Sequence, residues 1–200
     1  METQNIIITG GANRIGAEIA KSLAGYNTNI TIHYNRSKAK AHNLKKILEN
    51  KGSKIFLVKG NLANLKDLKK IIIFAKKNMK KVDCLINNAS LFENDNIETF
   101  TNNSLDNHIN INLKAPAILS KEFFKIVSKK STGCIINIID QRVFKLTPHF
   151  LSYTLSKTGL HTLTKITAMG LAPNVRVNGI APGPTIQNIR QSKKHFKKQY

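Results

Sequence analysis

A tyrosine and a lysine lie one helical turn apart at Tyr153 and Lys157, and Asp140 precedes them along the chain. Side chains with this spacing share one face of a helix, so the phenol and the ammonium are expected to lie close together. A phenol has a pKa of about 10, and a neighbouring ammonium favours its ionised form and makes it a better proton donor. The spacing therefore predicts that Tyr153 is a general acid assisted by Lys157.

A second interpretation is that the two residues simply share an amphipathic helix, which is a common arrangement. Asp140 follows an apolar run that indicates a strand, and Asn112 lies on an earlier predicted helix. Together these residues favour the catalytic interpretation, in which the candidate catalytic residues are Tyr153, Lys157, Asp140 and Asn112.

A glycine-rich turn, TGGANRIG at 9–16, follows the first apolar run of the chain. Gly10, Gly11 and Gly16 allow a tight turn, and a helix that starts there directs its positive end toward a phosphate. An ordinary strand–helix turn is the alternative. The position directly after the first predicted strand favours a dinucleotide site.

The end of the second predicted strand, HYNRS at 33–37, bears on the choice of cofactor. NAD sites usually carry an acidic residue about 20 residues beyond the glycines, and none is present here. Arg36 and Ser37 could instead bind a 2′-phosphate by charge and hydrogen bonding. The segment therefore predicts NADPH rather than NADH, with Arg36 as a solvated surface cation being the alternative.

Strands are predicted at 6–8, 29–34, 54–60, 82–87, 133–140 and 174–180 from short apolar runs. Between them, helices are predicted at 14–25, from the Ser37 cap to 49, at 65–79, at 103–128 with a kink at Pro116, and at 151–171. This alternation predicts an α/β fold, a Rossmann-like doubly wound parallel sheet with helices on both faces, in one domain over 1–200. Ligands of such sheets bind at the carboxyl ends of the strands, which Gly10, Asn87, Asp140 and Pro182 follow.

Composition narrows the choice of partners. The net charge of +21 arises from lysines spread along the chain, which favours a solvated basic surface over a specific nucleic-acid site. Apolar runs are too short to span a membrane. Free thiols without a disulfide framework fit a cytoplasmic protein, and a small-molecule substrate is expected. The two cysteines, Cys84 and Cys134, fall in predicted central strands and are expected to be free, buried thiols without a metal.

The motifs resemble the short-chain dehydrogenase/reductase family over nearly the whole chain. TGGANRIG (9–16), NNAS (87–90), Asn112, YTLSK (153–157) and PGPT (182–185) occur in the order and spacing of that family. Within it, the chain most resembles pteridine reductases and their dihydropteridine-reducing relatives. The resemblance rests on Arg14, where many members have glycine, on HYNRS, and on Asp140, where most members have serine.

The resemblance implies an NADPH-dependent reductase of a small C=N or C=O substrate, with Tyr153 and Asp140 delivering the proton. Asn112 would support Lys157 through an ordered water, and Phe92 would either stack on a pterin or be a core aromatic. The implied substrate residues are Arg14, Phe92, Asp140 and Tyr153. The implied cofactor residues are Gly10, Arg14, Ile15, Gly16, His33, Tyr34, Asn35, Arg36, Ser37, Asn61, Leu62, Asn88, Ala89, Ser90, Lys157, Pro182 and Gly183.

The sequence departs from the family pattern in two places. Asn61-Leu62 stands where members usually have Asp-Leu, and 183–200 form an incomplete substrate region with no expected last helix or seventh strand. The second departure raises the alternative of a catalytically impaired remnant that at most binds nucleotide. Helices in the positions of 103–128 and 151–171 often form a dimer face in this family, so the resemblance allows a homo-oligomer if the chain folds stably, and the sequence leaves the oligomeric state open.

Overall fold

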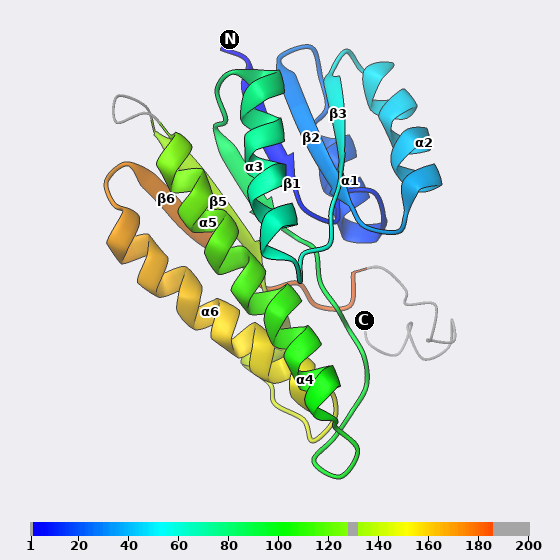
Figure 1. Ribbon diagram of the computed structural model, residues 1–200, viewed down its shortest axis with the longest axis vertical. Helices are drawn as coiled ribbons and strands as arrows, with labels where there is room; N and C mark the ends of the chain where they lie inside the picture. Colours follow the sequence, from blue (N-terminus) through cyan, green and yellow to red (C-terminus); the bar gives the residue numbers. More distant parts are fainter. Residues whose placement is uncertain (1, 128–131, 186–200) are drawn as a thin grey trace.

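Six parallel strands form one sheet in the order β3-β2-β1-β4-β5-β6 in the computed structural model, which describes residues 2–127 and 132–185 (Figure 1). The strand order reverses between the neighbours β1 and β4, which makes their carboxyl ends the topological switch point of the sheet. The strands are β1 (Gln4–Ile8), β2 (Thr28–Tyr34), β3 (Lys54–Lys59), β4 (Cys84–Asn87), β5 (Gly133–Ile138) and β6 (Val175–Ile180).

Helices pack on both faces of the sheet, as predicted. Their bounds are α1 (Arg14–Leu23), α2 (Lys38–Glu49), α3 (Leu65–Met79), α4 (Asn102–Ile109), α5 (Ala115–Ile126) and α6 (Leu151–Leu171). Apolar side chains of α1 and α2 join one buried cluster, and those of α3, α5 and α6 join the other.

The apolar strand residues explain this two-layer core. Alternate side chains of a strand point to opposite faces, so Ile7 enters one cluster while Ile6 and Ile8 enter the other. Ile7 and Ile8 are fully buried, and burial of such a side chain contributes about 1.5–3 kcal/mol. A strand that is covered on both faces must be apolar throughout. The short isoleucine run therefore predicts that β1 is such a strand.

The helix predicted at 103–128, with an interruption at Pro116, is interrupted just before that proline. A π-helical turn over 110–114 separates α4 from α5, and the Ala115 N–H donates to the carbonyl of Asn110. Pro116 has no N–H, so the carbonyl of Asn112 lacks its α-helical partner, and the irregularity falls just before the proline. Asn112 is completely buried within this turn.

The two cysteines are free, as predicted, but they are half-buried rather than buried. They lie on the sheet face that α1 and α2 cover. On β6 the residues of that face, Arg176, Asn178 and Ile180, are exposed, because this side of the sheet has less helical cover. The cysteines lie on β4 and β5, between the part of this sheet face that α1 and α2 cover and the part on β6 that is exposed.

No helix within 2–127 and 132–185 is both long and apolar enough to cross a membrane. In the same residues, no group of three or more His, Cys, Asp or Glu side chains is arranged to hold a metal ion. Most of the predicted incomplete substrate region, 186–200, lies outside the described residues.

Candidate active site

A cleft of about 830 Å³ lies at the carboxyl ends of the strands, beside the switch point. Chain segments far apart in sequence line it: the glycine turn, the end of β2, the segments after β3, β4 and β5, and 182–185. The sequence-predicted residues along its wall are Gly10, Arg14, Ile15, Gly16, His33, Tyr34, Asn35, Arg36, Ser37, Asn61, Leu62, Asn88, Ala89, Ser90, Phe92, Asp140, Tyr153, Pro182 and Gly183. Lys157 and Asn112 are buried behind this wall.

The glycine turn is shaped by close backbone contacts. Gly10 adopts φ +60°, and an added Cβ would lie 2.9 Å from Cα of Ala89. A Cβ at Gly16 would collide with the Asn88 amide and the Gly10 carbonyl. The Asn88 amide itself donates to the carbonyls of Thr9 (2.9 Å) and Gly10 (3.2 Å), so its side chain fixes the turn from the cleft side.

The start of α1 suits an anionic group. Its N-cap residue, Asn13, makes no side-chain capping bond, so first-turn N–H groups are not satisfied by that side chain. The positive end of the helix and the absent Cβ atoms in the turn fit the diphosphate of a dinucleotide. Arg14, the first residue of α1, has φ 49°, a left-handed conformation that favours glycine and costs a non-glycine residue about 1 kcal/mol. This conformation accounts for the glycine that many family members have here.

His33 has a structural task that the sequence did not indicate. Its Nδ1 accepts the N–H of Gly10 (3.1 Å), and its Nε2 donates to the carbonyl of Gly60 (3.0 Å). Burial lowers the pKa of His33, in keeping with a neutral ring that accepts at one nitrogen and donates at the other. Both ring nitrogens are used to join the glycine turn to the end of β3. His33 also lines the cleft, and its contact with the cofactor stays a prediction.

The Asn61-Leu62 segment forms a turn at the cleft wall. The Asn61 side chain accepts the backbone N–H of Ala63 (3.1 Å), and the backbone N–H of Asn61 donates to the carboxylate of Asp67 (2.7 Å). Leu62 is buried in the core. Asn61 therefore keeps the backbone turn that brings this segment to the cleft, in the place where the family usually has an aspartate.

Tyr153 and Asp140 form the central hydrogen bond of the site. The phenol donates to Asp140 Oδ2 at 2.7 Å, while Oδ1 of the same carboxylate accepts the N–H of Arg142 (2.9 Å). Burial and the adjacent Asp140 carboxylate raise the pKa of Tyr153. Burial and the Asp140 carboxylate outweigh the effect expected of Lys157, so the phenolate is disfavoured. Tyr153 is therefore a protonated phenol at neutral pH.

Lys157, which is predicted to contact the cofactor, is buried behind the residues that line the cleft. The residue is 2% exposed, and its ammonium donates to the carbonyl of Ile138 (2.8 Å) and lies 5.7 Å from the centroid of the Tyr153 ring. Burial lowers the pKa of Lys157 to about 8, and Asp140 partly opposes this shift. The ammonium is thus held under the tyrosine rather than at the cleft wall.

Asn112 joins the segment after β4 to α6. Its side chain accepts the N–H of Leu91 (2.8 Å) and donates to the Leu91 carbonyl (2.9 Å) and to the Ser156 hydroxyl (2.9 Å). The Ser90 hydroxyl also donates to it at 3.3 Å. The side chain is engaged with Leu91, Ser90 and Ser156, and the support of Lys157 through an ordered water stays a prediction.

Asp95 is a positioning residue that sequence reasoning missed. Its carbonyl accepts the N–H groups of Phe150 (2.7 Å) and Leu151 (3.3 Å), and its carboxylate accepts that of Ser152 (3.1 Å). Burial alone would raise the pKa of Asp95, but hydrogen bonds from Ser152 and Ser104 outweigh burial and lower it. Asp95 thus satisfies three successive N–H groups at the start of the helix that carries Tyr153.

An aromatic stack of Phe92, Phe150 and Arg142 stands beside the phenol. The Phe92 and Phe150 rings are parallel with centroids 4.5 Å apart, and the Arg142 guanidinium lies 4.5 Å from the Phe150 centroid. Phe92 also meets the Tyr153 ring edge-on at 4.6 Å. Phe92 therefore packs against other rings and also lines the cleft, and its stacking on a pterin stays a prediction.

Phe150 and Arg142 were missed because their signals are indirect. Phe150 precedes α6 and adopts φ 61°, in the left-handed region. Aromatic residues rarely adopt this conformation, so the residue type does not predict it from the sequence. Arg142 follows Asp140 by two positions and could have been noted for that proximity alone.

Comparisons with known proteins agree with this geometry. The model of the family described as short chain dehydrogenase matches residues 4–198. Dehydrogenase/reductase SDR family member 4 of Caenorhabditis elegans is 31% identical over 180 residues, covering 88% of this chain and 69% of that protein. The 3-oxoacyl-(acyl-carrier-protein) reductase FabG of Staphylococcus epidermidis is 28% identical over 187 residues, covering 93% of this chain and 77% of that protein.

Among solved structures, FolM alternative dihydrofolate reductase 1 of Brucella suis in complex with NADP is 37% identical, with a TM-score of 0.93. The similarity covers 98% of this chain and 78% of that one. The sequence match, the sheet topology and the cleft at the switch point lead to one conclusion: the chain belongs to the short-chain dehydrogenase/reductase family of nicotinamide-dependent oxidoreductases.

Proposed function

We propose that this protein is an NADPH-dependent reductase of a small C=N or C=O substrate, with a dihydropterin as the first candidate. The observation that carries the proposal is the 2.7 Å hydrogen bond from Tyr153 to Asp140 beside the half-exposed ring of Phe92. This arrangement provides a proton donor, an acid partner and a flat apolar surface within one cleft. The similarity to a FolM alternative dihydrofolate reductase supports a pterin-type substrate.

The glycine turn and the N-terminus of α1 would hold the diphosphate of the cofactor, with Arg36 and Ser37 at the 2′-phosphate. The nicotinamide cofactor, when bound, supplies the hydride. The residues of this chain orient the substrate, exclude water and deliver the proton. Phe92 offers a ring face against which a planar heterocycle can stack.

Tyr153 would give its phenolic proton to the substrate nitrogen or oxygen. A phenolate next to an ionised Asp140 would place two negative charges in hydrogen-bond contact, which is unfavourable. We therefore propose that Tyr153 and Asp140 work as one unit that takes up a further proton from solvent, which Asp140 holds. Asp140 passes this proton to the phenol as the phenol's own proton moves to the substrate, so the pair ends as a neutral phenol and a carboxylate. The ammonium of Lys157 beneath the ring offsets the negative charge that develops.

Oxidation of NADPH by the purified chain tests the proposed function. The chain is first checked for folding by circular dichroism and then assayed with a dihydropterin and with a 3-oxoacyl thioester. Turnover with the dihydropterin only is the expected result. Turnover with the thioester only would replace the proposed substrate. A folded chain that binds NADPH and reduces neither substrate would favour the non-catalytic remnant.

Arg36 tests the choice of cofactor, because it is exposed at the cleft wall directly after β2. Arg36→Ala is expected to weaken NADPH binding by about 10-fold or more, since charge-assisted hydrogen bonds contribute about 1.5–3 kcal/mol. NADH binding should change less than about 2-fold, because NADH lacks the 2′-phosphate. Fluorescence titration measures both affinities. Lys38→Ala, which removes a nearby exposed cation away from the cleft wall, is the matched control. Equal losses for the two cofactors would exclude Arg36 as the phosphate ligand.

A further inference from the structure

The two cysteines of the chain lie side by side on neighbouring strands. Cys84 in β4 and Cys134 in β5 are direct register partners, and such partners point to the same face of a sheet. Neighbouring strands lie about 4.8 Å apart, and a disulfide accepts Cα separations of about 4.4–6.8 Å. The two sulfurs can therefore be joined without a large movement of the backbone.

The electrostatic surroundings of the two thiols differ. Arg176 on β6 is the register partner of Cys134 on its other side, whereas Asp83 directly precedes Cys84. A hydrogen bond from Cys84 and the charge of Arg176 lower the pKa of Cys134. The same hydrogen bond, burial and the Asp83 carboxylate raise the pKa of Cys84. The cation of Arg176 beside Cys134 and the carboxylate of Asp83 beside Cys84 therefore favour Cys134 as the thiol that ionises first.

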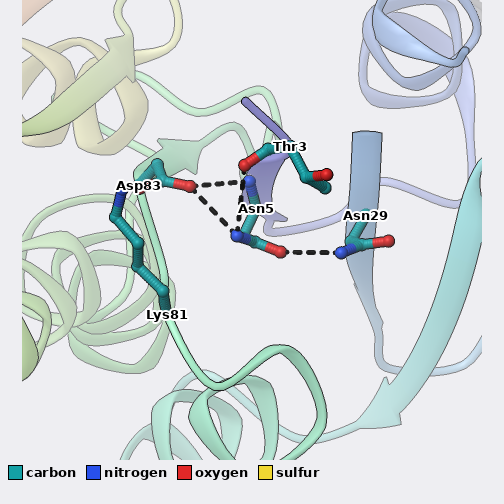
Figure 2. A network of polar contacts seen from close by, with 5 residues as sticks. All are labelled: Thr3, Asn5, Asn29, Lys81 and Asp83. Atoms are coloured by element: carbon teal, nitrogen blue, oxygen red, sulfur yellow. Dashed lines mark hydrogen bonds and ion pairs between the residues drawn. The ribbon is translucent and has the colours of Figure 1, made fainter. Parts of the chain in front are cut away.

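A polar network fixes the strands beside the thiols (Figure 2). The backbone and side-chain N–H groups of Asn5 donate to Asp83 Oδ2 (2.9 and 3.1 Å), and Lys81 pairs with the same carboxylate (3.0 Å). The Asp83 carbonyl accepts the N–H of Cys134 at 2.9 Å. Asn29 extends the network by donating to the side chain of Asn5 (2.8 Å). These bonds hold β1, β4 and β5 in the register that places the two sulfurs together.

The two cysteines are remote from the cleft and lie beside an exposed part of the sheet. Both cysteines are half-buried, and the neighbouring Arg176 is exposed. They lie near the amino ends of β4 and β5, whereas the cleft lies at the carboxyl ends. This end of the sheet faces solvent at Arg176, and the proposed reductase chemistry makes no use of it.

We propose that Cys84 and Cys134 form a redox-active dithiol, with Cys134 as the attacking thiolate and Cys84 as the resolving thiol, and that a low-molecular-weight disulfide oxidises it. The Cys134 thiolate attacks one sulfur of the small disulfide, whose S–S bond breaks and releases one small thiolate. Cys84 then loses its proton to solvent and attacks Cys134 Sγ, which expels the second small thiolate. The two protein thiols lose two electrons, and the small disulfide gains them as two thiols.

Oxidised glutathione is the probe that tests this order of events. After acid quenching and alkylation, intact mass and peptide mapping of the full chain should show a Cys84–Cys134 disulfide and little glutathione adduct. Cys84→Ser should accumulate the adduct at Cys134, because the resolving thiol is gone. Cys134→Ser should react at least about 10-fold more slowly at Cys84, because the thiolate is the attacking species.

Arg176→Gln provides a second test that leaves both thiols in place. It should slow the first reaction several-fold near neutral pH by raising the pKa of Cys134. Circular dichroism and thermal melting of each variant establish that the fold is kept. Equal rates for the two serine variants, a wild-type adduct at Cys84, or disulfides only between chains would overturn the proposal.

Discussion

Tyr153→Phe is expected to lower turnover by about 10²–10⁴-fold, the contribution typical of a positioned acid. The substitution removes only the hydroxyl that donates to Asp140 at 2.7 Å, and it keeps the ring that meets Phe92 edge-on. NADPH affinity should stay almost unchanged, because the glycine turn and the end of β2 are untouched. Steady-state NADPH oxidation and fluorescence titration measure the two effects separately.

The control for Tyr153→Phe is Tyr26→Phe, which removes a hydroxyl from a side chain that is 89% exposed and lies outside the cleft wall. This variant should match the wild type in turnover and in NADPH affinity. If Tyr153→Phe also kept wild-type turnover, Tyr153 would not be the proton donor and the mechanism would fail.

Asp140→Asn is expected to lower turnover by roughly 10²-fold, because the amide cannot return a proton to Tyr153. Asparagine can still accept the Arg142 N–H and caps helices as well as aspartate, so the local backbone should be preserved. The loss would then report the missing carboxyl chemistry rather than a changed fold.

The same variant should also change the pH profile. The Asp140 carboxylate raises the pKa of Tyr153 and that of Lys157, and both residues act in their protonated forms. Loss of the carboxylate lowers both pKa values, so both groups lose their protons at a lower pH. The alkaline loss of activity should therefore begin at a lower pH than in the wild type. Initial rates across the alkaline range measure this shift. An unchanged rate and an unchanged alkaline limb would exclude Asp140 from the proton transfer.

Much of the fold could be predicted because its signals are local. The apolar run of Ile6, Ile7 and Ile8 marks a strand covered on both faces, and the alternation of strands with helices gives the parallel sheet. The glycine turn and the Tyr153–Lys157 spacing locate the cleft for the same reason, since each is contained in one segment.

The features that escaped prediction depend on contacts between distant segments. Both ring nitrogens of His33 are committed only because the glycine turn and Gly60 meet at the end of β2. Asp95 reaches Ser152 across 57 positions, which no local pattern reveals. The exposure of Cys84 and Cys134 depends on how far the helical layer extends over the sheet, which their own apolar runs do not show.

The Asp95 contact also orders the assembly of the cleft in time. During synthesis, the glycine turn, β2 and β3 leave the ribosome long before α6 does. The entropic cost of closing the loop from Asp95 to α6 depends weakly on its length, about 0.6 kcal/mol per doubling, and the three backbone hydrogen bonds to Asp95 oppose that cost. The nucleotide half of the cleft can therefore form on the nascent chain, while the proton-donating half must wait until α6 has been made and has docked.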